Sequence, residues 1–167
     1  MRPLTRTRMA TRSEEGFTLL ELVVVMSIAS VLLGIGIFGF TNWREMAQQQ
    51  GSASELNSTL RTASVRAVSE GRAYCVNISG VSTYTLWRYT CGTGTAVAGP
   101  FSVQSTKVSL AATVTPPSPA PACPAGSSCL YFYPRGTAIP ATVTVSSTAR
   151  SKIYTVNVEG LTARVYM

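Results

Sequence analysis

The titratable side chains that most enzymes use are scarce in this chain. It has no His and no Asp, and its seven acidic residues are all Glu. Ser-His-Asp and Cys-His catalysis, His-ligated metal sites and pairs of aspartates are therefore excluded. Lys107 and Lys152 are the remaining candidates for a general base, which leaves little room for a hydrolase. We expect no catalytic residue, no metal site and no cofactor.

Four cysteines are the other residues with chemistry of their own. An even number of cysteines with no histidine favours disulfide bonds over zinc. The spacings of 16, 32 and 6 residues also fail to give two C-x2–4-C pairs. Four cysteines allow three pairings, and we prefer the one that closes two short local loops, Cys75 with Cys91 and Cys123 with Cys129. Disulfides indicate an oxidising compartment outside the cytoplasm.

Glu21 interrupts the start of a long apolar segment. From Leu22 to Phe40, 19 residues carry no charge, and as a helix they span about 28 Å, close to the roughly 30 Å core of a bilayer. The run exceeds the ~7–15 residues of a signal-peptide core, and no A-x-A-like site follows it. We predict a transmembrane helix over residues 17–40, with the basic residues before it in the cytoplasm.

The carboxylate of Glu21 needs an explanation at this place. An ionisable group inside an apolar segment costs a few kcal/mol unless it finds a partner or has a function. Glu21 either reaches the lipid headgroups or pairs with a positive group on a neighbouring subunit. We favour the second hypothesis.

Length and composition indicate one folded domain with a basic balance. The chain has 167 residues, 46% of them hydrophobic and only 13% charged, which excludes a disordered chain. The net charge is +7. A basic surface attracts nucleic acid or acidic lipid, and the plainer interpretation is solubility.

The helical pattern continues beyond the apolar segment. Leu56, Leu60, Ala63 and Ala67 repeat at helical spacing, so we predict one helix from Thr18 to Glu70, whose part over 41–70 is amphipathic. Gly71 is the expected stop. Residues 71–167 then read as a β-rich head with a Pro-rich loop over Thr115–Pro121. The expected strands are Ala73–Asn77, Tyr84–Thr90, Phe101–Leu110, Cys129–Tyr133, Thr142–Ser146, Ile153–Val158 and Ala163–Tyr166.

The residues around Glu21 resemble the prepilin motif of type IV pilins and type II secretion pseudopilins. The shared features are a short basic leader, Gly16, then Phe17, then Glu as the fifth residue after Gly16, then the apolar run. The resemblance implies that residues 1–16 are a leader removed by a prepilin peptidase, and that Phe17 is N-methylated. It also implies that Glu21 neutralises the Phe17 amine of an adjacent subunit during filament assembly. Because two opposite charges attract strongly in a low dielectric and each alone is penalised, such a pair would set the register between subunits.

The C-terminal part resembles the GspH/FimT-like group of minor pilins and pseudopilins. The residues that carry this resemblance are Tyr131–Gly136 and Val158–Val165. It implies an α+β, type IV pilin-like fold, with a long N-terminal transmembrane helix packed on a C-terminal antiparallel β-sheet head. Some members of the group bind DNA through a Gly-Arg-x-Arg-like C-terminal element, and the matching stretch here, Gly160–Arg164, holds one Arg.

We therefore expect a minor pilin or pseudopilin that enters or primes a type IV pilus-like filament. Its expected partners are other pilin subunits, the prepilin peptidase, a pilus or secretion assembly platform and membrane lipid. Its expected location is the inner membrane, single-pass with the head outside the cytoplasm, and then the filament. Two alternatives stay open, a type II secretion pseudopilin and a minor pilin that binds DNA for uptake. The candidate DNA contacts are Arg135, Arg150, Lys152 and Arg164, with Tyr131 and Tyr133 for stacking.

Overall fold

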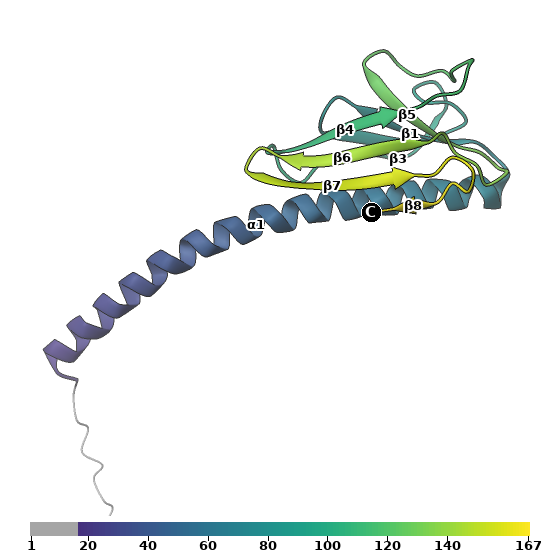
Figure 1. The fold of residues 1–167 in the computed structure, drawn as a ribbon. Helices are drawn as coiled ribbons and strands as arrows, with labels where there is room; N and C mark the ends of the chain where they lie inside the picture. The colour runs from purple at the N-terminus through teal and green to yellow at the C-terminus, as the bar shows by residue number, and fades with distance from the viewer. Residues whose placement is uncertain (1–16) are drawn as a thin grey trace, which may run out of the picture. The chain divides into compact units, whose positions relative to one another are not determined.

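The computed structural model describes residues 17–167, apart from the side chains of residues 36–39, Asn42 and Arg150. The predicted leader, residues 1–16, lies outside the described residues. The chain forms two compact units, Met1–Thr41 and Asn42–Met167. Helix α1 (Leu19–Glu70) begins in the first unit and ends in the second (Figure 1), close to the predicted bounds.

In the first unit, α1 exposes its apolar side chains around the whole helix. The five consecutive residues Leu22–Met26 are each at least 47% exposed, and five consecutive positions cover more than one turn of 3.6 residues. No face of this part is therefore buried within the chain. Among the described residues, no helix is both long and apolar enough to cross a membrane.

In the second unit, α1 buries one face and ends at a glycine. Leu56, Leu60, Ala63 and Ala67 are fully buried, as their spacing predicts. Gly71 has φ +64°, and the N–H of the next residue donates to the carbonyl of Ala67 at 3.2 Å. This is a Schellman ending, which places glycine where a side chain would strain the backbone.

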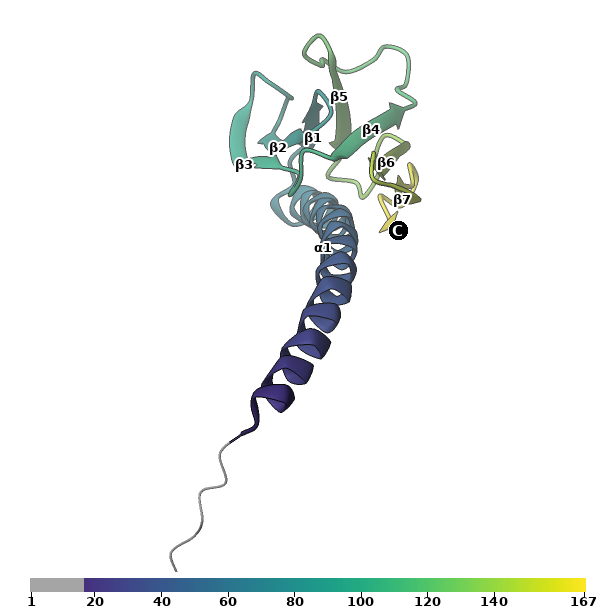
Figure 2. The ribbon, with the colours of Figure 1, turned by 90° about the vertical axis from the view of Figure 1, so that its left-hand side faces the viewer.

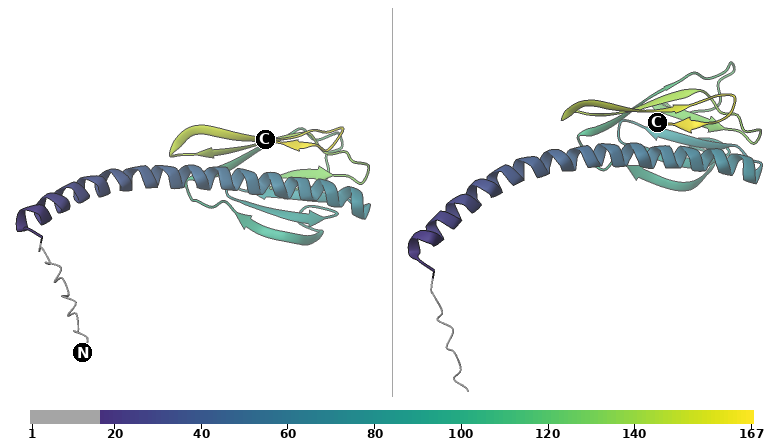
Figure 3. Two further views of the ribbon diagram at one scale, coloured as in Figure 1. Left: turned by 90° about the horizontal axis from the view of Figure 1, so that it is seen from below. Right: turned by 60° about the horizontal axis from the view of Figure 1, so that its bottom comes forward.

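Two four-stranded antiparallel sheets lie on the buried face of α1. Figure 2 shows them next to each other above the helix, and the left view of Figure 3 shows one sheet on each side of it. The first sheet has the order β3-β2-β1-β5 and the second the order β4-β6-β7-β8. Their bounds are β1 (Tyr74–Ser79), β2 (Thr83–Arg88), β3 (Thr95–Ser102), β4 (Val108–Val114), β5 (Ser127–Phe132), β6 (Ala141–Ser147), β7 (Arg150–Val158) and β8 (Val165–Tyr166).

One predicted strand is wrong. Phe101–Leu110 was expected to be continuous, but it holds the end of β3 and the start of β4, which belong to different sheets. The chain crosses between the sheets here, and the backbone N–H of Gln104 donates to the hydroxyl of buried Ser52 on α1 at 3.1 Å. The first part of β3 was missed because Gly99 and Pro100 read as strand breakers. The predicted loop over Thr115–Pro121 is confirmed, since no strand includes it.

The core joins α1 to the inner faces of both sheets. Gln49 is the buried polar residue that fixes the helix to the second sheet, because its amide donates to the carbonyls of Val145 at 3.2 Å and Lys152 at 2.7 Å. Both bonds satisfy a polar group that would otherwise destabilise the core. The apolar core contains Tyr74, Val76 and Ile78 of β1, Leu130 and Phe132 of β5, and Val143, Val145 and Val156 of β6 and β7.

Candidate functional site

The start of α1 is a capping box. Thr18 precedes the first helical residue, and its hydroxyl accepts a hydrogen bond from the backbone N–H of Glu21 at 3.2 Å. Thr at the N-cap with Glu three residues later is the capping-box sequence. The carboxylate also stands at the positive end of the helix dipole. Glu21 therefore has a local role in starting the helix, which the Thr-x-x-Glu spacing already signals.

The Glu21 carboxylate has no opposite charge beside it. Glu21 is exposed, and among residues 17–167 the ion pair found is between Lys107 and Glu45. Phe17 is 83% exposed and lies before the helix. Gly16 lies outside the described residues. The two described members of the predicted assembly site are thus both open to contact with other molecules.

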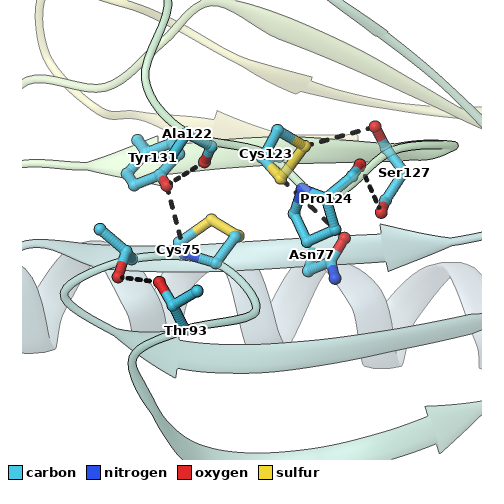
Figure 4. The surroundings of a disulfide bond; sticks show 11 residues. Cys75, Asn77, Thr93, Ala122, Cys123, Pro124, Ser127 and Tyr131 are labelled. Carbon is cyan, nitrogen blue, oxygen red and sulfur yellow. Dashed lines mark hydrogen bonds between the residues drawn. A yellow bond between two sulfur atoms is a disulfide. The ribbon is translucent and has the colours of Figure 1, made fainter.

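The outer face of the first sheet carries two disulfides. The structure joins Cys75 to Cys91 and Cys123 to Cys129, with Cα–Cα distances of 5.5 and 5.7 Å; this is the pairing preferred from the sequence. The Tyr131 hydroxyl lies between them, donating to the carbonyl of Ala122 and accepting from the N–H of Cys91 (Figure 4). Together these groups hold the loop after β2 and the loop before β5 against the sheet.

Three of the sulfur atoms lie close together, those of Cys75, Cys91 and Cys129, all within 4.8 Å of one another. A metal would need thiolates, and each of these sulfurs is in a disulfide. In this state the three sulfur atoms therefore form covalent cross-links and are not available as metal ligands.

Arg135 and Lys152, two of the four residues expected to contact DNA, lie far apart along α1. The turn that holds Arg135 lies beside Val68, since a side-chain carbon at Gly136 would be 3.9 Å from Val68. Lys152 lies beside Gln49, 19 helical positions earlier, which is about 28 Å along α1. The Lys152 ammonium also sits over the ring of Tyr154, 4.8 Å from its centroid. The side chain of Arg150 lies outside the description.

Arg164 is placed instead beside Arg61 of α1. The Nε of Arg61 donates to the carbonyl of Val165 at 3.3 Å, and the hydroxyl of Ser64 donates to the carbonyl of Ala163 at 3.1 Å. Arg66 is exposed five positions later, about 140° around the helix, and lines the same hollow as Arg61. Because about 100 residues separate α1 from Arg164, no local sequence signal could have grouped them.

Tyr84 is a buried titratable group of the core. Its hydroxyl has no hydrogen-bond partner among the described residues. Burial, with the Glu55 carboxylate nearby, raises the pKa of Tyr84 to about 12. A hydroxyl that is buried without a hydrogen-bond partner costs free energy at neutral pH instead of stabilising the head.

Two family models match the chain. Residues 11–37 match the prokaryotic N-terminal methylation motif, and residues 52–162 match the type II transport protein GspH. The second match covers most of the helix–sheet unit described above. No curated protein sequence matches the chain.

Solved structures share the fold at low sequence identity. The minor pseudopilin EpsH from the type 2 secretion system of Vibrio cholerae aligns with TM-score 0.55 and 14% identity, over 71% of this chain and 94% of that one. The type IV minor pilin FimU of Pseudomonas aeruginosa aligns with TM-score 0.54 and 15% identity, over 75% of this chain and 91% of that one. At this identity the likeness shows the fold, an α+β arrangement of one helix on antiparallel sheets.

The fold, the methylation motif and the matched family thus agree with one another. The chain belongs to the GspH family of type II transport proteins and is a pilin-like structural subunit of the minor pilin or pseudopilin class.

Proposed function

We propose that the chain is made as a prepilin, cut after Gly16 by a membrane prepilin peptidase and methylated on the amine of Phe17. The sequence Gly16-Phe17-Thr18 followed by an apolar helix supports this order of events. So does the position of Phe17, which is exposed and precedes the first helical residue. A peptidase needs an extended, accessible segment at the bond that it cuts.

The exposed carboxylate of Glu21 carries the proposal. It stands four residues after Phe17 and has no ion-pair partner among the described residues. When apolar helices pack together in a filament, a lone carboxylate loses its water and costs several kcal/mol. The positive amine of Phe17 on an adjacent subunit would neutralise it, and the pair would fix the stagger between subunits.

Residues 17–40 are proposed to hold the mature chain in the inner membrane before assembly. Their uncharged run and the exposed apolar side chains around α1 support contact with lipid. The two disulfides support a head outside the cytoplasm. The chain would cross the membrane once, until an assembly platform of a pilus or a type II secretion system extracts it into the filament.

The proposed role is structural rather than catalytic. DNA capture gains no support from the basic residues expected to perform it, since Arg135 and Lys152 lie near opposite ends of the head part of α1. A duplex or single strand bound by four such residues would need them along one groove.

The decisive experiment compares three substitutions in cells that assemble the filament. Glu21→Gln keeps a side chain that can close the capping box but removes the charge. Glu21→Ala removes both, and Thr18→Ala removes the cap alone. We expect both Glu21 variants to be processed and membrane-bound, with filament incorporation falling roughly a hundredfold or more. One member of a buried pair left alone costs about 3–5 kcal/mol. Thr18→Ala should lower incorporation only a few-fold.

Intact mass and N-terminal sequencing of the membrane-bound protein provide the accompanying measurement. A mature chain that begins at methylated Phe17 agrees with the proposed processing. A chain that still begins at Met1 in the presence of active peptidase contradicts it. Normal incorporation of Glu21→Gln contradicts the pairing, because that variant changes the charge and keeps the helix cap.

A further inference from the structure

One side of α1 in the head is left uncovered. The left view of Figure 3 shows the helix in front of both sheets, with no other described segment across it. This side holds two shallow hollows of about 480 and 340 Å³ that meet at Arg61 and Val65. We call it the arginine face and define it by Ser58, Arg61, Thr62, Val65 and Arg66 of α1 together with Arg164.

The arginine face is positive, and its three arginines, Arg61, Arg66 and Arg164, are free of ion pairs within the described residues. Glu70 stands four residues after Arg66 on α1, and the backbone N–H of Glu159 donates to the carbonyl of Arg164 at 2.9 Å, but both carboxylates accept hydrogen bonds from hydroxyl groups. Glu55 lies near the Tyr84 hydroxyl, Glu70 accepts a hydrogen bond from the Tyr74 hydroxyl at 2.6 Å, and Glu159 accepts one from the Thr162 hydroxyl at 2.7 Å.

The centre of the face is apolar. Val65 is 66% exposed between the three arginines, with Ser and Thr hydroxyls around it. Arginine and an exposed aliphatic group inside a polar rim are typical of protein–protein contacts. A nucleic acid site would instead favour exposed aromatic side chains for stacking, and none lines either hollow.

We propose that the arginine face binds an acidic surface on a different pilin-like subunit. This inference rests on the proposed assembly into a filament and names the kind of neighbour. A second copy of the chain fits poorly, because residues 42–167 carry ten Lys and Arg against four Glu. Two such heads of net charge +6 repel each other, and like charges placed together in an interface cost several kcal/mol. The subunit would therefore sit next to an acidic partner rather than in a run of its own copies.

Photo-crosslinking in cells that assemble the filament tests this contact. A benzophenone amino acid replaces Val65 in the full-length chain, and the matched control places it at Val81, in the β1–β2 turn, which is 64% exposed. We expect an adduct from position 65 with a different subunit, mapped by mass spectrometry to a segment rich in Asp and Glu. Position 81 should not give that adduct.

Charge exchange then separates a specific contact from general attraction. Arg61→Glu with Arg66→Glu should lower the adduct yield from position 65 at least about tenfold, which corresponds to roughly 1.4 kcal/mol. Lys107→Glu with Lys152→Glu changes the net charge equally but beside Glu45 and Gln49, about 18 Å or more along α1 from Arg61, and should change the yield less than about twofold. Replacing the mapped acidic residues of the partner subunit with lysine should restore the adduct yield of the chain that carries Arg61→Glu and Arg66→Glu.

Four outcomes would overturn the inference: no adduct at position 65, an adduct with a second copy of this chain, an adduct removed by nuclease, or equal loss in both charge variants. The proposed function is judged separately by whether the unmodified chain is processed and enters filaments. If filaments contain the chain but no adduct forms at position 65, the proposed contact of the arginine face is refuted and the proposed function is not. A chain that never enters filaments refutes the proposed function.

Discussion

Helix α1 has two regions whose apolar residues differ in burial. In the head, Leu60 is fully buried against the two sheets, while in the first unit Leu32 is 64% exposed. Both residues are leucines on the same helix. The head region thus finds its apolar partners within the chain, whereas the region over residues 19–35 has none among the described residues.

Because of this difference, the head region of α1 contributes to the stability of the folded chain, whereas the first region contributes to assembly. Burial of a leucine contributes about 2 kcal/mol only when it is removed from water, so the head can fold on its own contacts. The first region gains that contribution only when lipid or neighbouring helices cover it. Substitutions in the two regions should therefore be detected by different measurements, and the following predictions use that expectation, from the largest effect to the smallest.

Leu60→Ala and Leu32→Ala provide the most direct comparison. Leu60→Ala should lower the free energy of unfolding of the head by about 3 kcal/mol, because it leaves a cavity in a packed core. Leu32→Ala should change it by less than about 0.5 kcal/mol while reducing filament incorporation. Denaturant titration of the full chain in detergent, followed by tryptophan fluorescence, measures the first quantity. Equal destabilisation by the two variants would contradict the division of α1 into two regions.

The disulfides should stabilise the head alone. From loop lengths of 16 and 6 residues, removal of Cys75–Cys91 as a double alanine variant should cost about 3 kcal/mol, and removal of Cys123–Cys129 about 2 kcal/mol. Hydrogen exchange of the amides of residues 19–41 should stay unchanged in both variants, because both disulfides belong to the second unit. Faster exchange there would show that the two regions unfold together.

Tyr84 should make the stability of the head, but not of the first region, depend on alkaline pH. Burial raises its pKa from 10 to about 12, so the folded chain keeps the proton that the unfolded chain loses. The stability is fully present below pH 10 and falls as pH rises towards 12, by about 3 kcal/mol in all. Tyr84→Phe should weaken this pH dependence, with the raised pKa values of Tyr74 and Tyr133 leaving part of it, and should leave stability at pH 7 unchanged or slightly higher. Denaturant titrations at pH 8 and 11 compare the two chains, and an equal slope would contradict the assignment.

Local patterns in the sequence were enough for the helix and for most strands. The spacing of Leu56, Leu60, Ala63 and Ala67 predicts the buried face, and Gly71 predicts the end of the helix. Alternating Val and Thr over Val143–Val145 predict a strand with one buried face, which is observed in β6. These features depend on neighbours within a few residues, so the sequence alone contains them.

Features that depend on distant contacts could not be predicted. The break between β3 and β4 follows a crossing between sheets that is anchored by Gln104 to Ser52 of α1. The grouping of Arg61 with Arg164 likewise requires the final turn to lie against the helix. The capping role of Thr18 is different, because its Thr-x-x-Glu signal is local and visible in the sequence.

The cap at Thr18 gives the smallest predicted effect, and it tests the first region without touching the head. Thr18→Ala removes the hydroxyl that accepts from the N–H of Glu21, which should destabilise the first turn by about 1 kcal/mol. The amides of the first helical turn should exchange roughly fivefold faster, while the head amides stay unchanged. Thr62→Ala is the matched control, because its hydroxyl bonds only to the carbonyl of Ser58 one turn earlier. Unchanged exchange in Thr18→Ala would mean that the apolar packing of lipid or detergent, rather than the cap, determines where α1 begins.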